Sequence, residues 1–378
     1  MSNSDSTLTQ NPHGTTLITG GAGFIGTNLA DRLASAGGRV IIFDNLSRPG
    51  VERNLRWLLE RHGSQIRFVG GDIRDPGAVK TSVRDADRVF HFAAQVAVTT
   101  SLSDPVEDFD INARGTLNLL EAVRALARPV PLLFTSTNKV YGELQDVELQ
   151  EQETRYAPPS DCRLVGGIDE TRPARFHSPY GCSKGAADQY VLDYAHTFSL
   201  PATVFRMSCI YGPHQCGNED QGWVAHFLIR TLRGEPITFY GDGKQVRDIL
   251  FVNDLIEAML QAQAKISDTA GHCFNIGGGP ANTVSLLELT ELIHEIGKRK
   301  PELRFEAWRL ADQRFYVSDI SRFGAVTGWK PRVSVREGVT RLLNWLIEHQ
   351  RLPVREEKAR SNKGTPAYVT QINRRATA

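Results

Sequence analysis

A tyrosine and a lysine stand four residues apart in the segment 177–190, at Tyr180 and Lys184. In a helix, this spacing places both side chains on one face, one turn apart. A free tyrosine loses its proton only near pH ~10, but a neighbouring cation favours the phenolate and lowers that value. The pair could therefore act as a general base if the chain also binds a redox cofactor. Without one, a half-buried ring beside a solvated amine is the ordinary interpretation of the spacing.

A glycine-rich turn supplies evidence for such a cofactor. Gly20, Gly23 and Gly26 follow a short apolar segment and open a helical pattern. Glycine lets the backbone approach the phosphates of a dinucleotide, whose pyrophosphate would lie at the helix N-terminus. Asp44 ends the next apolar segment, where a carboxylate can bind the adenosine ribose and repel a 2′-phosphate, which favours NAD over NADP. Arg48 stands close by in the chain and could instead serve such a phosphate.

The elements around these residues predict an α/β fold with a Rossmann-type doubly wound parallel sheet. Buried strands are expected to alternate with helices. The expected strands are residues 15–20, 39–44, 66–73, 87–94 and 130–137, and one long helix is expected over 104–126. Asp72 and Ile73 end the third strand, and Ala93, Ala94 and Gln95 follow the fourth. The carboxyl ends of such strands face the ligand crevice, although Asp72 could equally be a turn residue.

The pattern also predicts how the chain is divided. Residues 1–13 form a polar lead, and residues 14–206 form the NAD-binding domain. Segments 248–252 and 272–277, within about 246–277, are expected to return as strands to the main sheet. Residues 207–245 and 278–348 would form a smaller α/β substrate-binding lobe, and 353–378 a tail. The 38 residues between Tyr141 and Tyr180 exceed an ordinary connection and indicate a functional excursion.

Composition excludes several classes of protein. The formal net charge of +1 on 378 residues gives no basic field for nucleic acid. The five cysteines form no CxxC pair, and no metal-ligand spacing is present, so free thiols in a reducing compartment are expected. No apolar run approaches the length of a membrane span, and the N-terminus lacks an apolar signal core. These features favour a cytoplasmic protein with no metal, membrane or nucleic-acid partner.

Taken together, these motifs resemble those of the extended short-chain dehydrogenases/reductases of the nucleotide-sugar epimerase group. The matching residues are the glycine turn, Asp44, Asn112, the segment 136–142, and the pair Tyr180 and Lys184, so the resemblance covers about residues 14–348. It implies that Tyr180 is the base, Lys184 its electrostatic support and Thr137 its hydroxyl partner. The cofactor contacts that it implies are Gly20, Gly23, Phe24, Ile25, Gly26, Asp44, Asn45, Ser47, Arg48, Asp72, Ile73, Ala93, Ala94, Gln95, Asn112, Ser136, Tyr180 and Lys184.

A finer resemblance points to the branch that acts at C2 of CDP-linked 3,6-dideoxyhexoses. It is carried by the segments 43–48, 95–101, 176–190, 243–248 and 312–320. It implies reversible inversion at C2 through a transient 2-keto sugar, with NAD tightly bound and regenerated in each cycle. A 4-epimerase or another NAD-dependent modifier of a nucleoside-diphosphate sugar is the alternative. A dinucleotide-binding protein without turnover is disfavoured, because a sensor needs no proton relay.

The same resemblance predicts the substrate side. Arginines suit bidentate contacts to a diphosphate. The expected substrate contacts are Thr137, Asn138, Cys209, Tyr240, Gln245, Arg247 and Arg314. Cys209 stands where many members of the group carry asparagine, and Asn138 follows Thr137 where the dehydratases carry an acidic pair, which argues against a 4,6-dehydratase. The helices at 104–126 and 178–198 are expected to pair in a homodimer, with a tetramer possible.

Overall fold

The computed structural model describes residues 14–160, 163–309 and 312–349, and the expected lead and tail lie outside this part of the chain. The strands are β1 Thr15–Thr19, β2 Arg39–Asp44, β3 Ile66–Gly70, β4 Arg88–His91, β5 Leu132–Thr137, β6 Gln150–Glu151, β7 Tyr156–Ala157, β8 Ala202–Met207, β9 Cys209–Tyr211, β10 Ile237–Tyr240, β11 Val246–Phe251, β12 Cys273–Ile276, β13 Thr283–Ser285, β14 Leu303–Glu306 and β15 Phe315–Tyr316. The α-helices are α1 Phe24–Ser35, α2 Val51–His62, α3 Pro76–Val83, α4 Val98–Ser103, α5 Pro105–Phe109, α6 Gly115–Arg124, α7 Ser178–Thr197, α8 Trp223–Arg233, α9 Val252–Ala264, α10 Ile266–Thr269, α11 Leu286–Gly297, α12 Ser321–Thr327 and α13 Val335–His349.

A seven-stranded sheet in the order β12-β8-β5-β4-β1-β2-β3 forms the centre of the molecule. Every neighbouring pair in it is parallel. From β1 the chain adds β2 and β3 on one side and then β4, β5, β8 and β12 on the other. The boundary between β1 and β4 is therefore the switch point where ligands bind in doubly wound sheets. The predicted α/β class and the five predicted strands of the first half are confirmed.

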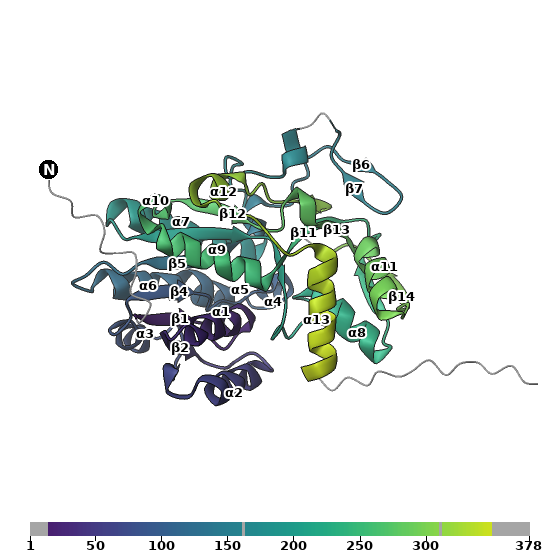
Figure 1. Ribbon diagram of the computed structural model, residues 1–378. Coiled ribbons are helices and arrows are strands. Elements are labelled where there is room, and N and C mark those ends of the chain that lie inside the picture. Colours follow the sequence, from purple (N-terminus) through teal and green to yellow (C-terminus); the bar gives the residue numbers. More distant parts are fainter. Residues whose placement is uncertain (1–13, 161–162, 310–311, 350–378) are drawn as a thin grey trace, which may run out of the picture.

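Two layers of helices bury the two faces of this sheet (Figure 1). Because successive strand residues point to opposite faces, Leu17 packs with α3, α6 and α7, whereas Ile18 packs with α1, α2 and α9. Both side chains have no exposed surface. This alternation explains why the strands appear in the sequence as continuous apolar runs, since both faces are covered.

The expectation that residues 248–252 return to the main sheet is wrong. Residues 248–251 belong to β11, which joins a separate four-stranded sheet with β13, β15 and β9, and Val252 begins α9. Residues 272–277 do return, because β12 pairs in parallel with β8 at the edge of the main sheet. Both segments are short and apolar, so their sequences alone could not distinguish the two partners.

A smaller lobe is built around its own apolar cluster, which includes Phe227, Phe239, Leu289 and Leu342. In Figure 1, α8, α11, β14 and α13 gather on one side of the sheet, away from α3 and α6. The excursion before α7 contains the hairpin β6–β7, which docks on this lobe: Tyr156 N donates to Lys244 O at 2.9 Å, and Lys244 Nζ pairs with Glu151 at 2.7 Å.

The long helix expected over 104–126 is interrupted. Asp104 caps α5 by accepting from Glu107 N at 2.9 Å, and a π-helical turn, Asp110–Arg114, separates α5 from α6. Such turns are rare and often occur at functional sites. Here the turn positions Asn112 close to α7, as described below.

Candidate functional site

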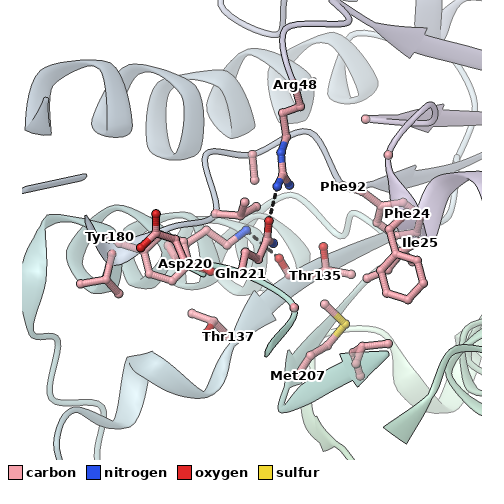
Figure 2. A pocket seen from close by; sticks show the side chains of 18 of the residues that line it. Phe24, Ile25, Arg48, Phe92, Thr135, Thr137, Tyr180, Met207, Asp220 and Gln221 are labelled. Atoms are coloured by element: carbon pink, nitrogen blue, oxygen red, sulfur yellow. Dashed lines mark hydrogen bonds between the residues drawn. The ribbon is translucent and has the colours of Figure 1, made fainter. Parts of the chain in front are cut away.

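One cavity of about 620 Å³ runs along the carboxyl ends of β1, β2, β4, β5 and β8 and into the smaller lobe. Within the described ranges it collects most of the residues that the sequence singled out. Figure 2 shows Tyr180 and Thr137 on one side of it and Phe24 and Ile25 on the other. Of the expected cofactor and substrate residues, Gln95, Asn112 and Arg314 are missing from its walls.

The glycine turn is shaped for close backbone contact. Gly20 has φ +68°, and a Cβ there would lie 2.7 Å from Ala93 N. A Cβ on Gly26 would lie 2.6 Å from Gly21 Cα, so neither position tolerates a side chain. Gly23 is the N-cap of α1 and also lines the cavity, so the helix begins with its amide groups directed at the pocket. Such a helix start suits an anionic group.

Asp44 is held at the end of β2 by the backbone. Its carboxylate accepts from Ala22 N at 3.0 Å and from Leu46 N at 2.8 Å. Burial raises the pKa of Asp44, and these two backbone donors oppose that rise. Asp72 lies further along the cavity, where the Arg74 side chain and the Asn45 amide lower its pKa.

Arg48 donates to the Gln221 side chain (Figure 2). The segment 218–222 is also held from the smaller lobe, where Tyr240 Oη donates to Glu219 at 2.7 Å and Arg309 pairs with Asp220 at 3.3 Å. The segment therefore spans the cavity between its two halves. Arg309 and Asp220 were not expected from the sequence, and no motif marked them.

The residues fit a dinucleotide such as NAD. The glycine turn leaves room beside a helix start, Asp44 offers a fixed acceptor, and the phosphate alternative for Arg48 is weakened by its bond to Gln221. The buried Ser136 hydroxyl lines the cavity and has no hydrogen-bond partner within the described residues. A buried hydroxyl of this kind is normally satisfied, so a ligand atom is the expected partner.

Tyr180, Lys184 and Thr137 converge as predicted. Both Tyr180 and Lys184 are buried near the start of α7, and the Thr137 hydroxyl at the end of β5 lies close enough to the Tyr180 hydroxyl to lower the pKa of Tyr180. Lys184 Nζ donates to Thr135 O at 2.6 Å and lies 4.2 Å from the centre of the Phe134 ring. The three side chains come from two neighbouring elements, since β5 and α7 pack together.

The expected lowering of the Tyr180 pKa is not produced by the protein alone. Burial raises the pKa of Tyr180 to about 12, with Asp108 acting in the same direction and Thr137 against it. Burial also lowers the pKa of Lys184 to about 7, although Asp188 and Asp108 favour its charged form. Desolvation disfavours both the phenolate of Tyr180 and the ammonium form of Lys184. Its effect on the pKa of Tyr180 exceeds the lowering that the sequence analysis expected from the neighbouring lysine.

Asn112 and Gln95 do not face the cavity. Asn112 is buried in the π-helical turn, where its Oδ1 accepts from Gln95 N at 3.0 Å and its Nδ2 donates to Ser183 Oγ at 3.0 Å. The Gln95 side chain bonds to the backbone of Ala97. Both residues therefore stabilise the loop after β4 through hydrogen bonds. The expectation that they contact a cofactor directly is corrected, because neither lines the cavity.

An ionic cluster lines the part of the cavity where the sequence predicted substrate contacts. Arg247 pairs with Asp312 at 2.8 Å, and Lys139 Nζ lies 3.6 Å from the same carboxylate oxygen. Burial would raise the pKa of Asp312, but the two cations hold it below its usual value. Cys209 lines the same wall, and burial raises the pKa of its thiol, so it is a protonated side chain rather than a nucleophile.

Arg314 points elsewhere. Its guanidinium lies 5.5 Å from the Tyr156 ring and 5.4 Å from the Trp308 ring, outside the cavity. Gln313, its neighbour, is fully buried. Arg309, which the sequence did not single out, lines the cavity instead. Its guanidinium lies 3.7 Å from the Tyr240 ring.

The expected contacts Tyr240 and Gln245 do line the cavity. Gln245 is nearly fully buried, its Nε2 donates to Tyr240 O at 2.9 Å, and its Oε1 has no partner among the described residues. A backbone carbonyl only accepts, so the free Gln245 oxygen is an acceptor available to a ligand donor. No cluster of potential metal ligands and no helix long and apolar enough to cross a membrane occurs in the described ranges.

The fold and cavity define a dinucleotide-binding α/β protein with a smaller second lobe. The chain belongs to the NAD dependent epimerase/dehydratase family, whose model matches residues 16–277. NAD is the cofactor of that family.

Individual relatives agree with this assignment. The chain is 44% identical to the CDP-paratose 2-epimerase of Salmonella typhi over 87% of its own length and 98% of that protein. Its fold is similar to the UDP-glucose 4-epimerase of Thermus thermophilus, solved with NAD, at a TM-score of 0.75 and 31% identity over 89% of this chain and 99% of that one. The fold is also similar to the UDP-glucuronic acid 4-epimerase of Bacillus cereus, solved with UDP-glucuronic acid and NAD. The TM-score is 0.75 and the identity 26%, over 88% of this chain and 99% of that one.

Proposed function

We propose that the protein is an NAD-dependent nucleotide-sugar epimerase that inverts C2 of a CDP-linked 3,6-dideoxyhexose. The observation that carries the proposal is the convergence of Thr137, Tyr180 and Lys184 beside a cavity built for a dinucleotide and a charged second ligand. The relative that acts on CDP-paratose is also the one that matches at 44% identity over almost its whole length.

NAD bound along the glycine turn would supply the acceptor and the donor of the hydride. Gly20, Gly23 and Gly26 would hold its pyrophosphate, Asp44 the adenosine ribose, and Lys184 the nicotinamide ribose. Phe24, Ile25, Asn45, Ser47, Arg48, Asp72, Ile73, Ala93, Ala94 and Ser136 line the remaining length of the site.

Tyr180 would take the proton of the C2 hydroxyl and return it after inversion. Lys184 would favour the phenolate, and Thr137 would keep the hydroxyl group and the phenol in one hydrogen-bonded chain. Arg247 and Lys139 would face the diphosphate, with Asp312 fixing their positions in its absence. Asn138, Cys209, Tyr240 and Gln245 complete the proposed substrate wall.

Asn138 and Lys139 bear on the type of reaction. Elimination from a sugar needs an acid that protonates the departing hydroxyl, and an amide followed by an ammonium group offers no carboxyl for this task. The residue types that follow Thr137 in the chain therefore support epimerisation over dehydration. A 4-epimerase remains the second candidate, because structural neighbours of this fold include UDP-sugar 4-epimerases.

The test is incubation of the purified protein with CDP-paratose or CDP-tyvelose, with the configuration at C2 followed by NMR. Interconversion without added NAD is expected, and failure with every CDP-, GDP- and UDP-sugar offered would overturn the proposal. A substrate deuterated at C2 or at C4 distinguishes the two epimerases, because only the label on the reacting carbon slows turnover. Tyr180→Phe should abolish turnover and keep the bound NAD.

We also propose a homodimer formed through α5 and α7. These helices pack side by side and carry exposed apolar side chains: Val106 is 69% exposed, Phe109 49% and Tyr190 45%. Exposed apolar side chains on adjacent helices suit a second copy of the same surface. Light scattering should give the dimer mass at micromolar concentration, and Val106→Asp should shift it towards the monomer. A monomeric mass for the unmodified protein would refute the interface.

A cytoplasmic location is proposed on the state of the thiols. Cys182, Cys209, Cys216 and Cys273 are all free. Unpaired cysteines suit a reducing compartment. Fractionation of the source cells with an antibody to the protein is the direct test, and recovery from an oxidising compartment would contradict the assignment.

A further inference from the structure

A chain of four hydrogen-bonding groups runs from the smaller lobe to the Thr137 hydroxyl. Gln313 Nε2 donates to Gly142 O at 2.6 Å, and Asn138 Nδ2 donates to Gln313 Oε1 at 3.0 Å. Thr137 Oγ1 then donates to Asn138 Oδ1 at 3.3 Å. Gln313 is fully buried, and the Thr137 and Asn138 side chains are each only 8% exposed.

The direction of every bond in this chain is fixed at its far end. Gly142 offers a carbonyl, which can only accept, so the Gln313 amide must turn its NH₂ group towards it. The Gln313 oxygen then faces Asn138, which must answer with its own NH₂ group. This leaves the Asn138 oxygen facing Thr137, where it can only accept a proton.

The Thr137 hydroxyl has one proton and two possible acceptors for it. One is Asn138 Oδ1, and the other is the Tyr180 oxygen once it has lost its proton. A neutral Tyr180 can itself donate to Thr137 Oγ1. The backbone N–H of Lys139 donates to Thr137 Oγ1 at 3.2 Å and so occupies one acceptor position of that oxygen.

We propose that Gln313 is a positioning residue that acts through Asn138, and that it holds the Thr137 proton away from Tyr180 while Tyr180 is neutral. Formation of the phenolate then requires the Thr137 hydroxyl to turn from Asn138 to Tyr180. Asn138 therefore competes with the phenolate for one hydrogen bond. The inference concerns the proposed catalytic group and rests on the role proposed for Tyr180.

Gln313 itself does not line the cavity, so neither cofactor nor substrate is expected to touch it. The charged and titratable groups around Tyr180 do not include Gln313. They are Asp108 on α5, Lys184 on the same helix as Tyr180, and Lys139 on the wall of the cavity. His91 and Asp188 lie behind Lys184. A substitution at Gln313 leaves all of these groups in the chain.

The experiment is an NMR titration of Tyr180 in protein labelled with [¹³Cζ]tyrosine and purified with its nucleotide. Tyr180→Phe identifies the resonance. Gln313→Met keeps the side-chain volume and removes both bonds, so Asn138 is free to turn. Loss of a competing neutral hydrogen bond worth ~1 kcal/mol should lower the Tyr180 titration midpoint by roughly 0.5–1 pH unit. Asn138→Leu removes the acceptor directly and should shift the midpoint in the same direction.

Gln263→Met is the matched control, because Gln263 is a buried glutamine on α9 outside the cavity. It should leave the midpoint unchanged. An unchanged or raised midpoint in both Gln313→Met and Asn138→Leu would overturn the proposal, as would an equal shift in Gln263→Met. If Gln313→Met does not fold, Asn138→Leu decides alone. No sugar is used, so a negative result here is separate from failure of the epimerase assay.

Discussion

At the scale of single residues, burial determines the chemistry of Lys184. Its pKa in the folded chain is about 7, whereas an unfolded lysine holds its proton to pH ~10. Between these values the unfolded chain binds more protons, so stability should rise as pH increases from 7 to 10. The raised pKa of Tyr180 acts only above this range.

Lys184→Met should therefore reduce the gain in stability with pH. Urea unfolding of NAD-stripped protein at pH 6.5 and pH 9 measures it, and the difference between the parent chain and Lys184→Met isolates this residue from the other lysines. The parent should gain more in its unfolding midpoint than the variant does. Equal gains would show that Lys184 stays charged in the folded chain.

Asp44 is a second residue whose position leads to a prediction. Its carboxylate is fixed by Ala22 N and Leu46 N, so it is ready to accept from ribose hydroxyls. A hydrogen bond to a charged group is worth ~1.5–3 kcal/mol, so Asp44→Asn should weaken NAD binding by about 10–100-fold. NADP binding should weaken less, because a repelling charge is also removed. Calorimetry on stripped protein measures both, with the exposed Asp193→Asn as control.

At the scale of elements, one buried ion pair joins α7 to β8. Arg206 donates to both oxygens of Asp188 at 2.9 Å, and Arg206 Nη1 donates to Tyr141 Oη at 3.2 Å. Tyr141 Oη in turn donates to Asn275 on β12. The pair thus helps to hold the helix that carries Tyr180 and Lys184 against the sheet.

Removing one partner should be much worse than removing both. Arg206→Met leaves the fully buried Asp188 without its arginine partner and should cost about 3–5 kcal/mol of unfolding free energy. Arg206→Met combined with Asp188→Leu should recover a large part of that loss. Denaturant unfolding of the two variants tests this. A double variant as unstable as the single one would mean that the ion pair itself, and not the stranded charge, carries the stability.

At the scale of the whole molecule, the segment 218–222 connects the two lobes across the cavity. Arg48 holds it from the dinucleotide side, and Arg309 and Tyr240 hold it from the other. Arg48→Met should speed the release of bound NAD by roughly 5-fold, since one charge-assisted bond is lost. Stopped-flow displacement measures the rate, with the exposed Arg56→Met on α2 as control. No change in rate would show that the segment does not limit release.

The sequence by itself determined the layout of the dinucleotide half. Glycine spacing, Asp44 and the pair Tyr180 and Lys184 are local patterns, because each depends on residues within one turn or one strand–helix unit. Five of the seven strands of the main sheet and the return of residues 272–277 were also predicted. These features depend on hydrophobic runs whose period is set by the backbone.

Only the tertiary structure decided which segments that are distant in the sequence contact one another and which side chains meet at the cavity. It assigned β11 to a second sheet, turned Arg314 away, and brought Arg309, Lys139 and Asp312 to the cavity. It also placed Asn112 behind the cavity and raised the pKa of Tyr180 through burial. Sheet partners, the direction of a side chain in a connecting segment and desolvation all depend on residues far apart in the chain, so no local pattern encodes them.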